Sequence, residues 1–196
     1  ILTGCLLEVE PTEARLVALD GFRLAMQKTQ EAFTLPEGTE QITSVIPGRV
    51  LNELGKILLD EETPCTLTIG KGHMQASFGN TRLNTVTLAG EYIDYKKILP
   101  SSFQTLAKVE RSALQDAIDR ASLMAREGKN NLIYLHLLPD GRMEMTANAD
   151  RGDVHEEMDI GFEGNELSIA FNSRYLTDII HNIDGERLCM CFNSNV

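Results

Sequence analysis

The sequence predicts an α+β fold in which one arrangement of strands and helix occurs twice. Short segments of β-forming residues, separated by turn signals, make up most of the chain. Three other segments carry apolar residues at helical spacing. Blocks from the first half recur in the same order in the second half. Many strands, few helices and no regular alternation of the two are typical of the α+β class.

Turn signals delimit the expected strands. Pro139-Asp140-Gly141 is the clearest hairpin turn, and a Gly-Lys-Gly sequence at 70–72 is a second. In the first half the expected strands are 6–10, 15–19, 22–28, 41–46, 66–69, 74–78 and 81–88. In the second half they are 132–138, 142–147, 154–160, 167–171 and 188–192, after a strand and helix expected within 103–128.

Each expected helix has an apolar stripe and an end signal. The first begins at Pro47, a residue suited to a first turn, and its stripe is Val50, Leu51, Leu54, Ile57 and Leu58. The second ends near Gly128, and its stripe is Leu114, Ala117, Ile118 and Ala121. The third is capped by Asn172 or Ser173 and stopped by Gly185, and its stripe is Leu176, Ile179, Ile180 and Ile183.

The repeat keeps nearly constant offsets. Pro11 and Pro139, each at a turn between two strands, lie 128 residues apart, and Arg49 lies 125 residues before Arg174. The strands that follow, in CTLTIGKGH and LCMCFNSNV, match at an offset of 123. Chance resemblance between generic amphipathic blocks is the plain alternative. Residue 1 corresponds to about residue 129, so the first copy has no counterpart of 103–128, and the second has no counterpart of the segment that follows His73 and ends at Pro100. We therefore expect that the chain is truncated at both ends.

Composition limits the classes of protein to consider. The 196 residues are 42% hydrophobic, which is enough to build a core, so a disordered chain is excluded. Four cysteines do not indicate a disulfide framework, and no apolar run reaches the length of about 18 residues that indicates a membrane span. The opening segment has no basic region typical of a signal peptide. A net charge of −11 argues against nucleic acid unless the few cations gather on one face.

The first and third helices place similar charged groups opposite their apolar stripes. The outward residues are Arg49, Glu53 and Lys56 in one, and Arg174, Asp178 and His181 in the other. A solvated helix surface is one interpretation, and a shared face turned toward a polyanion is the other. On the second helix, Leu123 lies opposite the stripe with Met124 on its flank, which indicates either an ordinary exposed residue or an oligomer contact.

Catalytic and metal-binding motifs are missing from the sequence. It contains no P-loop, Rossmann fingerprint, GxSxG or HExxH. Cys189 and Cys191 share a strand face, but a zinc site would need two more ligands at matching spacing. Cys5 and Cys65 could supply them only by coincidence of fold, so ordinary buried thiols are expected. The four histidines show no obvious carboxylate partner, and Asp20 before a glycine is more typical of a turn than of a catalytic acid.

Five segments, covering nearly the whole chain, are similar to one family. LVALDGFRLAM at 16–26 resembles the A-T-D-G-H-R-L-A pattern of the bacterial sliding clamp, the β subunit of DNA polymerase III. GEYIDYKKILP at 90–100 resembles its G-x-F-P-D-Y-x-x-x-P linker. The other three, in order, are LQDAIDRASLMAREGKNNLIYLHL, MEMTANADRGDVHEEMDI and ELSIAFNSRYLTDII.

The resemblance implies a DNA-clamp fold of repeated βαβββ units, with antiparallel sheets outside and helices inside a ring. Residues 1–100 would be the middle clamp domain without its start, and 101–196 the C-terminal domain without its last strands. It further implies a cytoplasmic, non-enzymatic processivity factor, with no metal or cofactor, that encircles duplex DNA as a homodimer. Its other expected partners are the catalytic subunit of DNA polymerase III, the clamp loader and further proteins with a clamp-binding motif.

The resemblance also implies site residues. The family has a hydrophobic groove between its middle and last domains that binds short peptides. The matching positions are Leu2, Leu19, Gly21, Phe22, Arg23, Leu24, Ile93, Lys97, Ile98, Asn172 and Tyr175. The departures from the family pattern are Phe22 for His, Leu19 for Thr, Ile93 for Pro and Lys97 for a frequent Arg. Core packing is the plain alternative for Leu2, Leu19 and Leu24.

Two further sets of positions follow from the resemblance. Arg49, Lys56 and Arg174 match helices that line the hole of the ring, and Leu123 with Met124 matches a head-to-tail dimer contact. Two rival functions remain at this point. One is a clamp-like module that binds peptides without being loaded on DNA, and the other is an enzyme that uses Asp20 or the cysteine pair.

Overall fold

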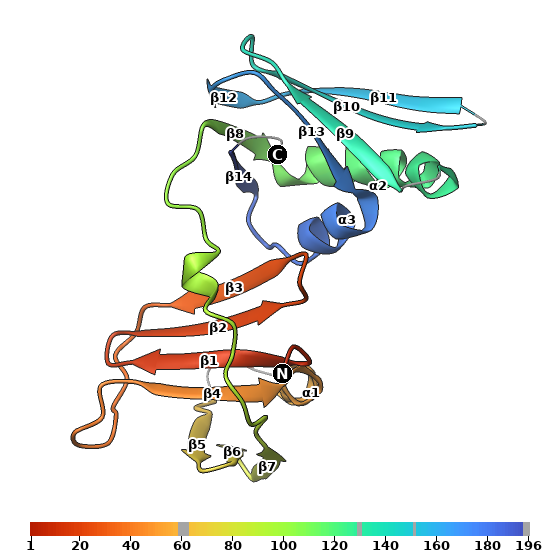
Figure 1. Cartoon of the computed structure of the whole chain (residues 1–196). Helices are drawn as coiled ribbons and strands as arrows, with labels where there is room; N and C mark the ends of the chain where they lie inside the picture. Colours follow the sequence, from red (N-terminus) through yellow and green to blue (C-terminus); the bar gives the residue numbers. More distant parts are fainter. Residues whose placement is uncertain (59–62, 129–130, 151, 194–196) are drawn as a thin grey trace. The chain divides into compact units, whose positions relative to one another are not determined.

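The computed structural model describes residues 1–58, 63–128, 131–150 and 152–193. Residues 129, 130 and 151, within two of the clamp-like segments, and the last three residues of LCMCFNSNV lie outside the described residues. The chain divides into two compact units, Ile1–Tyr95 and Lys96–Val196 (Figure 1).

Unit 1 contains two antiparallel sheets and a helix. Its four-stranded sheet has the order β3-β2-β1-β4 and is formed by β1 (Gly4–Glu10), β2 (Glu13–Leu19), β3 (Leu24–Thr29) and β4 (Ile42–Pro47). Helix α1 (Gly48–Ile57) follows β4 directly. The three-stranded sheet is a meander of β5 (Thr66–Gly70), β6 (His73–Phe78) and β7 (Thr81–Val86).

Unit 2 also contains two antiparallel sheets, here with two helices. The four-stranded sheet, in the order β11-β10-β9-β13, is formed by β9 (Leu132–Leu137), β10 (Arg142–Ala149), β11 (Gly152–Asp159) and β13 (Leu167–Asn172). The three-stranded sheet, in the order β12-β8-β14, is formed by β8 (Thr105–Glu110), β12 (Gly161–Gly164) and β14 (Arg187–Phe192). The helices are α2 (Arg111–Glu127) and α3 (Ser173–His181), and a short 3-10 turn η1 (Tyr95–Lys97) lies where the units divide.

The two units repeat one topology, as the sequence predicts. The order β3-β2-β1-β4 corresponds strand for strand to β11-β10-β9-β13. Register agrees as well, because Gly4 faces Pro47 in one sheet and Leu132 faces Asn172 in the other, at offsets of 128 and 125 residues. Each unit also contains one complete βαβββ run, β4-α1-β5-β6-β7 and β8-α2-β9-β10-β11. The predicted repeat is therefore confirmed in its topology.

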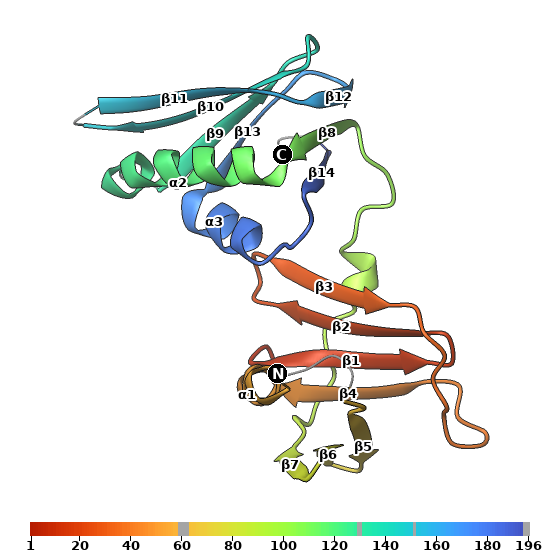
Figure 2. The same ribbon diagram turned by 180° about the vertical axis from the view of Figure 1, so that it is seen from behind.

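The core of unit 2 forms where α2 packs on the four-stranded sheet. The helix buries the predicted stripe, and its small residues let it lie close to the strands. The buried apolar residues of α2 are Leu114, Ala117, Ile118, Ala121 and Ala125, and they pack with Ile133, Leu135, Leu137, Met143, Met145 and Ala147 of the sheet. Figure 2 shows α2 and α3 on the same side of this sheet, which leaves its other face turned away from the helices.

Two leucines of α2 allow a test of this packing. Leu114 is 0% exposed and Leu123 is 67% exposed, although both lie on the same helix. Leu114→Ala is expected to lower the free energy of unfolding by about 3 kcal/mol, because it removes buried apolar surface and leaves a cavity. Leu123→Ala is the matched control and should change it by less than about 0.5 kcal/mol. Urea denaturation followed by circular dichroism measures both, and equal losses would contradict the assigned core face.

The other two helices differ from the sequence prediction in what they bury. In α1 only Leu54 is buried, while Ile57 is exposed, because residues 1–58 and 63–95 contain no second helix to pack against it. In α3 the buried residues include Leu176 and Ile180, whereas Ile179 is 46% exposed and lies off the stripe to which we assigned it. Helix α3 contacts both α2 and β13.

Two short elements were not predicted. Strand β12 begins directly after Ile160, where the sequence predicts only the end of one longer strand. The turn η1 has no apolar periodicity of its own, and its Tyr95 is buried in the core of unit 1. None of the helices in the described part of the chain has the length and apolar character that crossing a bilayer requires.

Candidate nucleic-acid interface and peptide-binding surface

The cations predicted to face DNA lie exposed on two equivalent helices. Arg49 and Arg174 each occupy the second residue of their helix, α1 and α3. Lys56 lies in the last turn of α1, where its Nζ is 2.8 Å from Glu53 Oε1. His181 ends α3 and contacts Asp119 Oδ1 of α2 at 3.2 Å. All four side chains remain accessible to solvent.

Charge is distributed unevenly between the helices and the rest of the chain. The three helices contain six Lys or Arg residues and five Asp or Glu residues, so their formal charge is slightly positive. The whole chain has a formal charge of −11. The strands and loops therefore carry the excess of acid, and the helices are the less repulsive surface for a polyanion.

A tight turn joins β2 to β3 and contains three of the predicted peptide-binding residues. The Asp20 carboxylate accepts the backbone N–H groups of Phe22 and Arg23 at 3.1 and 3.0 Å, and Gly21 has a φ of +89°. The Arg23 guanidinium donates to the same carboxylate from Nε at 3.0 Å and from NH2 at 2.8 Å. The Arg23 hydrogen bond, followed by the two backbone hydrogen bonds, holds the pKa of Asp20 below its usual value.

This arrangement confirms the turn interpretation of Asp20. A carboxylate with a lowered pKa and four N–H donors fixed on it is a poor proton acceptor. Its contacts instead hold Phe22 outward at the tip of the hairpin, where the ring is 82% exposed.

Two leucines flank the turn, one at the end of β2 and one at the start of β3. Leu19 and Leu24 are direct cross-strand partners in the β2–β3 register. Leu19 is buried in the core of unit 1 and Leu24 is half-buried against it. Core packing therefore accounts for Leu19, while Leu24 keeps part of its side chain at the surface.

The segment before η1 is fixed to the four-stranded sheet of unit 1. The Tyr92 hydroxyl lies 3.3 Å from the carbonyl oxygens of both Gly4 and Val17. The Tyr95 hydroxyl donates to Glu8 Oε2 at 2.6 Å, and both side chains are buried. Burial, and then the hydrogen bond to Glu8, raises the pKa of Tyr95 to about 12, so the phenol stays a donor.

The roles of these two tyrosines were not predicted from the sequence. Their partners are 75 to 88 residues away along the chain, so no local pattern reveals them. By holding the segment in place they also position Ile93, whose carbonyl oxygen accepts the N–H of Tyr95 at 2.8 Å. Leu2 and Ile93 both remain exposed in unit 1.

The other predicted peptide-binding residues lie in unit 2. Lys97 ends η1, and Ile98, which follows it, is 60% exposed. Asn172 caps α3 through its Oδ1, which accepts the N–H of Arg174 at 3.0 Å. Tyr175 is half-buried in the first turn of that helix. The cap shows that Asn172 also has a role in starting α3.

The two residues of the predicted dimer contact lie in different environments. Leu123 is exposed on α2, but Met124 packs against the core of unit 2. Nearby, Arg120 of α2 donates to both oxygens of Glu156 on β11, at 2.7 and 2.8 Å. Within the described residues β11 is an edge strand, so one side of its backbone is open to a further strand.

Two expectations about chemistry were wrong. Cys189 and Cys191 are exposed, with their Sγ atoms 3.8 Å apart, because they alternate along β14 with the residues that enter the core. Three of the four histidines have carboxylate contacts, which are His136 with Glu166, His155 with Glu157 and His181 with Asp119, at 2.9, 3.1 and 3.2 Å. Two of these carboxylates come from distant parts of the chain, Glu166 from just before β13 and Asp119 from α2, and Glu157 lies two residues along the same strand face as His155. Spacing in the sequence therefore did not reveal them.

Comparison with known proteins places both units in one family. The model for the DNA polymerase III beta subunit, central domain, matches residues 1–94, and the model for its C-terminal domain matches residues 96–196. A Staphylococcus aureus protein named Beta sliding clamp is 33% identical over 189 residues, which are 96% of this chain and 49% of that protein. A Staphylococcus epidermidis protein of the same name is 31% identical over 189 residues.

Solved structures of clamps are also similar to this chain. The DNA polymerase sliding clamp of Bacillus subtilis matches with a TM-score of 0.89 and 32% identity, over 98% of this chain and 50% of that chain. The DNA polymerase III subunit beta of Pseudomonas aeruginosa matches with a TM-score of 0.89 and 26% identity, over 98% of this chain and 52% of that chain. The chain thus has the clamp fold and spans about half the length of the curated relatives it matches. With both domain models matched in order, the chain belongs to the DNA polymerase III beta subunit family.

Proposed function

We propose that the full-length protein containing this chain is a sliding clamp, a non-catalytic processivity factor that encircles duplex DNA and tethers the replicative polymerase. The observation that carries the proposal is the charge of the helices. Six cations and five acids on α1, α2 and α3 stand against a formal charge of −11 for the chain. Family membership supports the same function, and such a factor would act in the bacterial cytoplasm.

The mechanism needs contact with phosphates but little affinity for them. Arg49, Lys56 and Arg174 are exposed and would meet the phosphate backbone without reading bases. Lys56 forms an ion pair with Glu53, and this pairing reduces the attraction between Lys56 and any one phosphate. Weak contacts keep the barrier to movement along DNA low, while closure of the ring prevents escape.

The tether would be a peptide-binding surface that includes Phe22, Leu24, Ile93 and Ile98. Phe22, Ile93 and Ile98 are exposed and Leu24 is half-buried, and apolar side chains at a surface accept leucine or phenylalanine anchors of a short peptide. Arg23, Lys97, Asn172 and Tyr175 would supply polar contacts. The proposed partners are the polymerase catalytic subunit, the clamp loader and other proteins with a clamp-binding motif.

Ring closure would use a head-to-tail dimer. We assign Leu123 to that contact because it is a large apolar side chain exposed on α2. The open edge of β11 would extend the contact through backbone hydrogen bonds. Met124 would support Leu123 from the core side.

A comparison of DNA topologies tests the proposal. The full-length protein, loaded on a nicked circular duplex by its clamp loader, is expected to remain bound through gel filtration and to be released when a nuclease linearises the circle. Equal retention on both forms would indicate tight direct binding and contradict the ring. Peptide binding without retention on the circle would favour the clamp-like module that is not loaded on DNA.

A further inference from the structure

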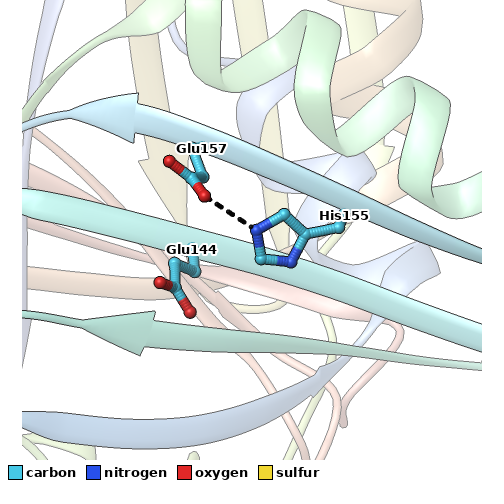
Figure 3. A group of neighbouring side chains, drawn as sticks. All are labelled: Glu144, His155 and Glu157. Carbon is cyan, nitrogen blue, oxygen red and sulfur yellow. Dashed lines mark hydrogen bonds and ion pairs between the residues drawn. The ribbon is translucent and has the colours of Figure 1, made fainter.

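The face of the β11-β10-β9-β13 sheet that is turned away from the helices carries a cluster of three potential metal ligands. They are Glu144 on β10 and His155 and Glu157 on β11 (Figure 3). One ligand atom from each residue can be chosen so that all three lie within 4.8 Å of one another. Among the described residues this is the one group of at least three such side chains.

Strand register explains why the three side chains meet. Glu144 and Glu157 are direct cross-strand partners, and His155 precedes Glu157 by two residues on the same face. Two carboxylates directly opposite each other repel, which disfavours the pairing unless a positive charge lies nearby. Arg142 supplies this charge beside Glu157, and the imidazole supplies a hydrogen-bond partner, since His155 Nε2 lies 3.1 Å from Glu157 Oε1.

The spacing fits a small divalent cation. Tetrahedral zinc with bonds of about 2.1 Å places its ligand atoms about 3.4 Å apart. The His155–Glu157 contact is already in this range, and Glu144 would approach by rotation of an exposed or half-buried side chain. Three protein ligands leave the fourth zinc position for water at this open surface.

Two further side chains and a hollow border the cluster. Arg142 NH1 lies 3.6 Å from Glu157 Oε2, which is the oxygen that does not contact His155. His136 Nδ1 lies 3.7 Å from Glu144 Oε2, so a second imidazole borders the cluster. A hollow of about 670 Å³, lined by residues that include Tyr134, His136 and Glu144, opens beside it and gives a hydrated cation access.

We propose that Glu144, His155 and Glu157 bind Zn²⁺ on this face of unit 2. An imidazole with two carboxylates suits zinc, whereas Mg²⁺ and Ca²⁺ prefer sites made of oxygen ligands alone. The site uses none of the side chains assigned to DNA, peptide or dimer contacts, although His155 and Glu157 lie on β11, whose backbone edge we assign to the dimer contact. Zinc binding to this chain can therefore succeed or fail separately from DNA and peptide binding.

Zinc titration against a chromogenic chelator tests the site in the intact chain. The exposed thiols of Cys189 and Cys191 would compete for zinc, so the titration uses the C189S/C191S variant. One zinc ion per chain is expected. His155→Ala should weaken binding roughly tenfold or more because it removes one of three ligands, and Glu144→Gln should also weaken it.

Matched controls separate the cluster from the rest of the surface. His73→Ala and Glu163→Gln remove an exposed imidazole and an exposed carboxylate elsewhere, and neither should change the zinc affinity. X-ray absorption should show only nitrogen or oxygen ligands at about 2.0–2.1 Å. No zinc binding, affinity unchanged in His155→Ala, or equal competition by Mg²⁺ would each overturn the proposal.

Discussion

Reversing three cations on the helices is expected to release the full-length protein from DNA while leaving peptide binding intact. The variant carries Arg49→Glu, Lys56→Glu and Arg174→Glu, all at exposed positions of α1 and α3. Each lost phosphate contact should reduce the slope of log affinity against log salt by about 1, so the expected change is about 3 per subunit. Reversal also introduces repulsion, and residence on nicked circles should shorten at least about tenfold.

A control with the same change in charge makes this result specific. Lys71, Arg82 and Lys108 are exposed cations on strands or turns, and Lys108 is paired with Glu163 at 3.1 Å, much as Lys56 is paired with Glu53. Glutamate at these three positions should leave residence on DNA nearly unchanged. If both triple variants lose DNA equally, net charge rather than a helix face governs retention, and our assignment of the DNA-facing residues is wrong.

Replacing Leu24 with aspartate is expected to abolish binding of short clamp-binding peptides. The side chain is half-buried beside Leu19, so a carboxylate there would be partly desolvated and would repel an apolar anchor. The loss should be at least about 30-fold in affinity, which corresponds to the roughly 2 kcal/mol typical of an interface hot spot. Fluorescence polarisation with a labelled peptide of the QLxLF type measures it.

The same substitution at Leu67 controls for surface charge. Leu67 is an exposed leucine on β5 of the same unit and is not among the predicted peptide-binding residues. Leu67→Asp should bind peptide as the unchanged protein does. Because Leu24→Asp also affects the edge of a core, Phe22→Ala provides a second test at an exposed ring whose removal should not disturb folding. Unchanged affinity in both Leu24→Asp and Phe22→Ala would contradict the peptide-binding assignment.

The sequence predicted the parts of this fold that depend on local chemistry. Turn residues such as Pro139-Asp140-Gly141 and the Ala-rich stripe of α2 specify their elements through neighbouring positions. The repeat was also detectable, since equivalent strands keep equivalent apolar positions. Interactions between distant segments could not be predicted in this way. The Tyr95–Glu8 hydrogen bond joins residues 87 positions apart, and the Arg120–Glu156 pair joins residues 36 apart.

In the candidate sites too, features that depend on local sequence were predictable and features that depend on distant segments were not. The outward cations of α1 and α3 follow from helical periodicity, so their exposure was predictable. The exposure of the two thiols on β14 was not, because it depends on which face of that strand the rest of unit 2 covers. The zinc ligands were missed because cross-strand register, which brings Glu144 to Glu157, is set by the hairpin and not by either strand alone.

The exchange of strands within unit 2 has a consequence for how the unit loses its structure. Strand β13 completes the sheet that begins with β9, and β8, from the start of the unit, pairs with β14 at its end. The part that contains β8 to β12 and the part that contains β13 and β14 cannot separate without breaking these backbone hydrogen bonds. Unit 2 is therefore expected to unfold in one cooperative transition. A proteolytic cut between β12 and β13 that separated the two pieces would leave one edge each of β8 and β9 open on one piece and β13 and β14 unpaired on the other, and such open strand edges promote aggregation.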